Sequence, residues 1–202
     1  MSGETLSSYG TVKASGSSVT VRYALPVFHE LDFVANEGYR RIPHGGIETG
    51  CLLFGKREQD SIQIEAFRLI ECEHASGPAF VLSAKDIEKL HTQIQEAGAD
   101  PELTGMEPLG WFIAHTRGEL ALTAADAALA KDLFRRPWQV TLLVKPEKFK
   151  PTKFVFVNAG APSSEITANL FTLPVLKGRS VRQEESSSPG PRPRRRRSPD
   201  NT

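Results

Sequence analysis

Residues 110–126, GWFIAHTRGELALTAAD, decide the predicted fold and hold most of the candidate functional residues. The apolar residues that precede His115 predict a buried strand, which we place at residues 108–116. Thr123 and Asp126 follow as a T-x-x-D pattern, which is typical of the N-terminal cap of a helix. The segment therefore predicts a strand that ends near His115 and leads into a capped helix.

The residues around this segment alternate between strand patterns and helix patterns. We predict helices at residues 26–38, 83–98 and 123–134, and further strands at residues 19–23, 46–56, 61–72, 138–146 and 153–159. The polar connector Arg-Glu-Gln-Asp predicts that the strands at 46–56 and 61–72 form an antiparallel pair. Helices interspersed with hairpins predict an α/β (α+β) fold, in which helices flank a mixed sheet.

Composition divides the chain of 202 residues into three parts. Residues 1–17 are rich in Ser, Gly and Thr and predict a flexible N-terminus, whereas residues 18–176 have the length and apolar content of one domain. Residues 177–202 hold eight basic and three acidic residues without apolar periodicity, which predicts a disordered Arg/Pro/Ser-rich tail. Two roles stay open for such a tail: weak polyanion binding through phosphate contacts, or a solubilising or partner-docking segment.

Other features of the composition exclude whole classes of protein. No run of about 18 apolar residues exists, so we expect no membrane span. The polar N-terminus predicts no secretory signal, and we expect a cytoplasmic protein. Cys51 and Cys72 both lie in apolar or strand-like surroundings, which predicts buried thiols in a reducing compartment and leaves a disulfide between them open.

Two segments together resemble the MPN (JAB/JAMM-type) metalloprotease domain family. The family pattern has a Glu in a context like E-T-G-G-x-L-x-G, and Glu48 stands at that position in IETGCLLFG. The family then has a G-W-x-H-S-H strand end, seven residues, Ser, two residues and Asp. Here His115 falls on the second His, Thr123 on the Ser and Asp126 on the Asp, with the same two spacings. The resemblance covers roughly residues 19–158 and implies a single MPN/JAB-like (cytidine-deaminase-like) domain.

The chain departs from the family pattern at several of these positions. Ile113 replaces the first His, Ala114 replaces the Ser between the two His, and Thr116 stands where a Pro often follows. Thr123 replaces the Ser and keeps a hydroxyl group. Ile113 is the most serious departure, because a hydrocarbon side chain cannot coordinate a metal ion.

The resemblance implies a role for each matching residue. In active members two His and one Asp hold zinc, water takes the open position, the Glu acts as general base, and the Ser stabilises the oxyanion. His115 and Asp126 are therefore the residual metal ligands, and Glu48 and Thr123 the vestigial or conditional catalytic residues. Alternate residues of a strand share a face, so Ile113 lies beside His115 where the missing ligand belongs.

Each of these residues also has a purely structural interpretation. Thr123 and Asp126 form an ordinary helix cap, with the carboxylate placed favourably against the helix dipole. His115 is then a hydrogen-bonded structural histidine and a partner for Glu48, whose carboxylate lies in a strand that reads as mostly buried. His44 is the nearest histidine that a metal could borrow as a third ligand, and His74 is a weaker candidate.

The sequence therefore predicts an MPN/JAB-like domain with an incomplete metal site, catalytically impaired and acting as a scaffold or protein-interaction module. The alternative is a zinc-dependent metalloprotease or isopeptidase that acts on ubiquitin-like or peptide conjugates with a substituted metal ligand. We expect no cofactor in the first case and zinc in the second. The resemblance implies protein partners, ubiquitin-like proteins among them, and leaves a homo-oligomer open.

Overall fold

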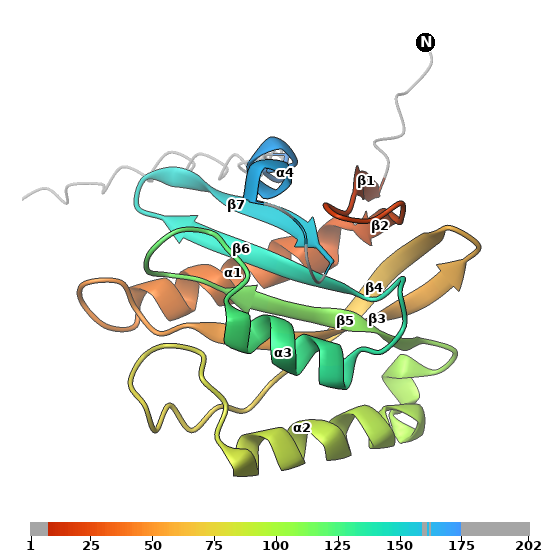
Figure 1. The fold of residues 1–202 in the computed structure, drawn as a ribbon, viewed down its shortest axis with the longest axis horizontal. Helices are drawn as coiled ribbons and strands as arrows, with labels where there is room; N and C mark the ends of the chain where they lie inside the picture. Colours follow the sequence, from red (N-terminus) through yellow and green to blue (C-terminus); the bar gives the residue numbers. More distant parts are fainter. Residues whose placement is uncertain (1–7, 159–160, 162, 175–202) are drawn as a thin grey trace, which may run out of the picture.

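The computed structural model describes residues 8–158, 161 and 163–174 of the chain. These residues form a mixed α/β single domain around one seven-stranded sheet (Figure 1). Its elements are β1 (Tyr9–Lys13), β2 (Thr20–Ala24), α1 (Leu25–Arg40), β3 (Thr49–Glu58), β4 (Ser61–Leu69), α2 (Ala84–Glu96), the short 3-10 helices η1 (Ala97–Ala99) and η2 (Pro101–Leu103), β5 (Glu107–Ala114), α3 (Ala124–Leu133), β6 (Val140–Glu147), β7 (Lys150–Val157) and α4 (Ser163–Ala168).

The sheet mixes parallel and antiparallel pairs in the order β1-β2-β4-β3-β5-β6-β7. β3 pairs antiparallel with β4 and with β5, whereas β2 and β4, and β5 and β6, are parallel. The central strands are buried on both faces, which explains why their sequences are nearly continuous apolar runs. The predicted mixed sheet and the predicted antiparallel pair of β3 and β4 are both confirmed.

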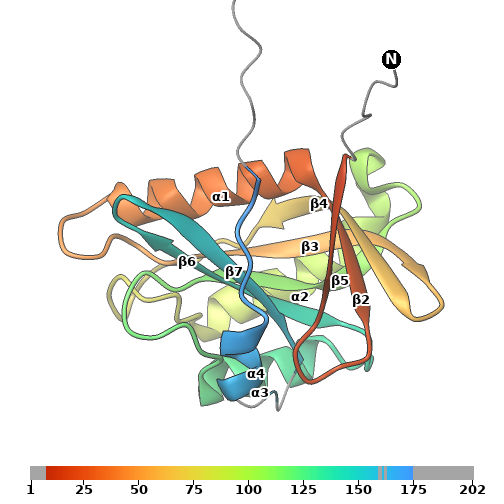
Figure 2. The ribbon, with the colours of Figure 1, turned by 90° about the horizontal axis from the view of Figure 1, so that it is seen from above.

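Helices cover both faces of the sheet and divide the core into two clusters. α1 packs Phe28, Leu31 and Ala35 against one face, with Phe112 of β5 among the strand residues beneath it. α2 and α3 pack on the other face, where Trp111 is fully buried. Figure 2 shows α1 along one side of the sheet and α3 along the other. Neighbouring residues of β5 therefore contribute to different cores.

The sheet nearly closes on itself at the outer edge of β7. The loop after β1 reaches that edge, where the Ser15 amide donates to the Phe156 carbonyl at 2.8 Å and the Asn158 amide donates to the Ser15 carbonyl at 3.0 Å. Phe171 pairs with Phe154 through two backbone hydrogen bonds of 2.9 Å each. The chain after α4 thus passes beside β7 and runs toward the side of the sheet that α1 covers (Figure 2).

Side-chain caps fix the starts of the two helices that border the candidate site. Ser83 accepts a hydrogen bond from the Asp86 amide, and the Asp86 carboxylate accepts one from the Ser83 amide, which completes a capping box. Thr123 caps α3 by accepting from the Asp126 amide at 3.1 Å. The Thr123 cap was predicted from the sequence, and both helices begin one residue after their capping residues.

The structure differs from the sequence-based prediction at the N-terminus. Residues 9–13, predicted to be part of a flexible segment, form β1 because their backbone pairs antiparallel with β2. The predicted tail at 177–202 and the end of the predicted domain at residue 176 lie outside the described residues. Cys51 and Cys72 are free thiols, the first buried and the second half-buried. Within the described part of the chain, none of the helices has both the length and the apolar character needed to cross a bilayer.

Candidate functional site

The sheet register brings the predicted site residues together from three elements. Thr49 of β3 lies opposite Ala114 of β5, so Glu48, just before β3, lies beside His115, just after β5. The amide of His115 continues the pairing with β6 by donating to the Val144 carbonyl at 2.8 Å. α3 then returns over this end of the sheet and carries the third residue of the group in its first turn.

His115 lies between two carboxylates. Its Nδ1 is 3.8 Å from Oε1 of Glu48, and its Nε2 is 3.8 Å from Oδ2 of Asp126. All three side chains are largely buried, with 9 to 13% of each exposed. We call these three residues the His115 cluster.

Glu48 is held by backbone amides from two loops. Its Oε2 accepts from the Phe80 amide at 3.1 Å, and its Oε1 accepts from the Thr116 amide at 3.0 Å. Burial raises the pKa of Glu48, but the His115 side chain and the two amides together outweigh burial and leave the pKa below its ordinary value of 4.5. The folded state therefore stabilises the charged form of this buried carboxylate.

The Glu48→Gln substitution is expected to lower the free energy of unfolding at neutral pH. It should also make that free energy fall less steeply as the pH is lowered. The charged carboxylate contributes stability above the unfolded-state pKa, and this contribution is lost as pH falls through the lower folded-state pKa. The amide keeps one acceptor for two donors, so we expect a loss of about 1–3 kcal/mol at pH 7. Urea unfolding between pH 7 and pH 3 measures both effects.

The control for this prediction is Glu88→Gln, which removes an exposed carboxylate of α2. In this variant the free energy of unfolding at pH 7 and its decrease toward pH 3 should stay close to those of the wild-type protein. If the decrease toward pH 3 is as steep in Glu48→Gln as in the wild type, the charged form of this carboxylate is not stabilised in the folded state.

Thr123 serves as a cap and as a donor to the cluster. Its hydroxyl donates to Oδ2 of Asp126 at 2.5 Å while its oxygen accepts from the Asp126 amide. Nε2 of His115 is buried and has no hydrogen-bond partner among the described residues. The cluster therefore presents one unpartnered ring nitrogen next to a carboxylate that is already hydrogen-bonded.

Ile113 occupies the position from which a further ligand would have to come. Strand alternation places it on the same face as Trp111, where both side chains are fully buried in the cluster beneath α2 and α3. Leu143 of the neighbouring β6 belongs to the same apolar cluster. Ile113 thus completes the core next to His115 and offers no donor atom.

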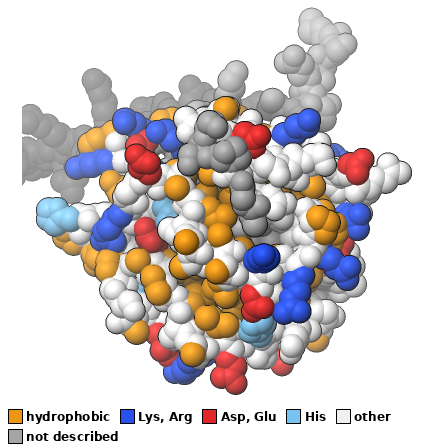
Figure 3. All heavy atoms as spheres, viewed as in Figure 1, with side chains coloured by type: hydrophobic (Ala, Val, Ile, Leu, Met, Phe, Trp, Pro, Cys, Tyr) orange, Lys and Arg blue, Asp and Glu red, His pale blue; other side chains and the backbone are white. Residues whose placement is uncertain are grey.

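A cavity of about 620 Å³ opens above the His115 cluster. All three cluster residues line it, as do Thr123, Arg117 and Asp132; its apolar lining comprises Ala79, Phe80, Val81, Leu82, Ile87, Trp111, Ala125, Ala128 and Leu129. Figure 3 shows hydrophobic side chains gathered in the middle of the face that carries α2 and α3. The cavity therefore combines a polar floor with mostly apolar walls.

The two histidines considered as borrowed ligands lie elsewhere. His44 lines a different cavity beside Tyr39, and Nδ1 of His74 is 3.2 Å from the Ala79 carbonyl oxygen. Across the described residues, no group of three or more His, Cys, Asp or Glu side chains is placed to hold a metal ion. The donor set of His115 and Asp126 is one ligand short of a catalytic zinc site, so these residues do not fit the resident zinc implied by the resemblance.

Sequence reasoning missed the loop that forms one wall of the site. Residues 78–82 fold back on the site, because the Pro78 carbonyl accepts from the Glu48 amide at 2.8 Å while the Phe80 amide holds the Glu48 carboxylate. Backbone donors leave no signature in a sequence. The available signal was the apolar run Ala-Phe-Val-Leu between a Gly-Pro pair and the capping Ser83.

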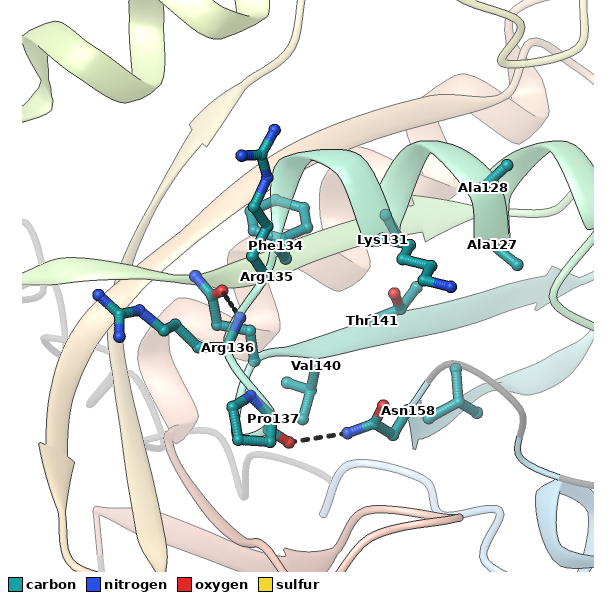
Figure 4. Close-up of a pocket in the computed structure, with 13 residues that line it drawn as sticks. Ala127, Ala128, Lys131, Phe134, Arg135, Arg136, Pro137, Val140, Thr141 and Asn158 are labelled. Atoms are coloured by element: carbon teal, nitrogen blue, oxygen red, sulfur yellow. Dashed lines mark hydrogen bonds between the residues drawn. The ribbon is translucent and has the colours of Figure 1, made fainter.

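A second cavity, of about 750 Å³, lies at the C-terminal end of α3 (Figure 4). Lys131, Arg135 and Arg136 contribute to it, but Figure 4 shows their side chains pointing in different directions. Arg135 is paired with Asp132 at 3.2 Å. These cations do not converge on one ligand group, so the cavity above the His115 cluster is the better candidate site.

This chain matches no protein-family model, and no curated protein is similar to it in sequence. Among solved structures, the solution structure of a protein from Desulfitobacterium hafniense is similar, with 16% identity and a TM-score of 0.42. The match covers 71% of this chain and 96% of that protein.

Proposed function

We propose that this chain is an MPN/JAB-like domain without a resident metal, which acts as a scaffold or protein-interaction module. The observation that carries the proposal is the burial of Ile113 in the core, at the position where the family has its first histidine. Supplying a ligand there would require a change of residue, because the described residues hold no group of three or more His, Cys, Asp or Glu side chains placed to hold a metal ion.

The other residues of the His115 cluster support a structural and binding role. Glu48 is held by two amides, Thr123 caps α3, and the Asp126 carboxylate accepts from the Thr123 hydroxyl, so each has contacts in the folded chain that need no metal. The largely apolar cavity above them supplies a concave surface of the size used for ligand recognition. We propose that another protein binds to this chain by covering the cavity.

One observation favours the alternative, a zinc-dependent isopeptidase with a substituted ligand. Nε2 of His115 and Oδ2 of Asp126 are 3.8 Å apart. Two ligands at the tetrahedral angle on one zinc ion, each about 2.0–2.1 Å from it, are separated by roughly 3.3–3.4 Å, so these two atoms would have to move slightly closer to share an ion. In such an enzyme a bound substrate or water molecules would have to complete the coordination, and Glu48 would be the general base.

Metal analysis of protein purified with zinc present decides between the two functions. We expect less than about one zinc per ten protein molecules after desalting, because two protein ligands bind zinc much more weakly than three. His115→Ala should leave this low zinc content unchanged. Stoichiometric zinc in the wild-type protein that disappears in His115→Ala would contradict the scaffold function and support the peptidase.

A further inference from the structure

The unpartnered nitrogen of His115 faces a carboxylate inside the cavity. Nδ1 lies next to Glu48, an acceptor, so the ring proton of the neutral imidazole belongs on Nδ1. Nε2 then carries a lone pair and lies 3.8 Å from Oδ2 of Asp126, which is also an acceptor. Two buried acceptors with no donor between them are unfavourable.

The missing donor can come from solvent or from a ligand. In the free protein a water molecule can supply it. A ligand that carries at least two N–H groups on one nitrogen can replace this water and donate to both acceptors. The site therefore selects for a multiple donor, and a group with only acceptors would meet lone pairs on both sides.

The charges around the cavity favour a donor that is also cationic. Glu48, Asp126 and Asp132 contribute carboxylates to its lining, but Asp132 is paired with Arg135 at 3.2 Å, which leaves two carboxylates against the single guanidinium of Arg117. The Arg117 guanidinium is directed to the loop before β3, where it donates to the His44 carbonyl at 3.4 Å. The polar floor thus has an excess of negative charge, which complements an ammonium group.

The walls of the cavity determine what carries the ammonium group. Phe80, Leu82, Ile87 and Leu129 provide apolar surface above the cluster, and Trp111 lies beneath Phe80 with ring centroids 6.3 Å apart. An unbranched hydrocarbon stem would bury its surface against these side chains while its end reached the floor. Such burial is favourable in proportion to the apolar area removed from water.

We propose that the cavity above the His115 cluster binds an aliphatic primary ammonium group. The ammonium nitrogen donates to Nε2 of His115 and Oδ2 of Asp126, and the stem packs on Phe80 and Leu129. A lysine side chain of a partner and a free alkylamine share this chemistry. The inference rests on the proposed function, because it requires that no metal occupies the same two acceptors.

The test is titration of the full chain with n-butylamine, followed by chemical-shift perturbation of backbone amides at neutral pH. We expect shifts centred on residues 79–82 and 115–126, and no comparable binding of n-butanol, which keeps the stem and loses the charge. Asp126→Asn should weaken butylamine binding roughly tenfold or more, because a charge-assisted hydrogen bond is lost. A lysine derivative blocked at both ends separates the two sources: its binding points to a partner's lysine, and binding of butylamine alone points to a small amine.

The matched control is Glu119→Gln, which removes the same charge from an exposed residue of the loop that precedes α3. Its affinity for butylamine should stay within about twofold of the wild type, since exposed charges contribute little. Equal binding by wild type and Asp126→Asn, or no binding by folded wild type, would overturn the inference. The zinc content of the same sample shows which proposal has failed. Stoichiometric zinc overturns the proposed function, whereas metal-free protein that does not bind butylamine overturns only this inference.

Discussion

Replacing Ile113 with histidine is expected to make the stability of the protein depend on zinc. The new imidazole points to the same face as His115 and completes a set of two histidines and Asp126. Without metal, the polar ring in a fully buried position should cost about 3 kcal/mol. With zinc at about 100 times its dissociation constant, Tm should rise by roughly 5–10 °C. Thermal unfolding with EDTA and with zinc measures the difference.

Two variants control for effects of Ile113→His that do not involve zinc. Ile113→Asn also places a polar group in the core but offers no good zinc ligand, so zinc should not restore its Tm. The double variant Ile113→His, His115→Ala should lose the zinc response while keeping the destabilisation. If Ile113→His binds zinc no better than the wild type, the alignment of this strand with the family motif is wrong.

The Gly110→Ala substitution is expected to be the most destabilising single-methyl addition in β5. Gly110 has φ of 145° and pairs with Val140 of β6, and a Cβ atom at this position would lie 1.8 Å from the Val140 carbonyl oxygen. The backbone of β6 must move, which breaks the pairing that also aligns His115 with Val144. We expect a loss of more than about 4 kcal/mol, a large part of the stability of a typical domain.

Soluble yield and urea unfolding of Gly110→Ala check this prediction. Gly98→Ala is the matched control, because no atom lies within 4 Å of the added methyl in η1. That variant should be as stable as the wild type or slightly more stable, since alanine reduces the conformational freedom of the unfolded chain. An unfolding midpoint of Gly110→Ala equal to that of the wild type would show that β5 and β6 adapt without cost.

The sequence predicted the elements better than their arrangement. Apolar runs and the capping pattern at Thr123 located the helices and most strands, because these signals are local. β1 was missed because its residues alternate weakly and only pairing with β2 makes them a strand. The strand order depends on contacts between distant segments, which no local pattern records.

The candidate site was predictable where spacing alone decides geometry. His115 and Ile113 are two residues apart, which predicted that they share a face, and the T-x-x-D pattern predicted the cap of α3. The position of Asp126 beside His115 was implied by the resemblance and not by spacing. The amides that hold Glu48 and the loop at residues 78–82 were not predictable, since they belong to backbone whose path is set by the whole fold. The MPN-like function itself stays a prediction.

The contacts at the outer edge of β7 have a consequence for how the protein folds during synthesis. Ser15 donates its hydroxyl to the Glu165 carbonyl across 150 residues of sequence, and Asn169 donates to the same hydroxyl oxygen. Contacts of such long range form slowly, because a large loop must close first. On the ribosome the contacts of the loop after β1 with this segment must therefore form late, after α4 and Phe171 have left the exit tunnel.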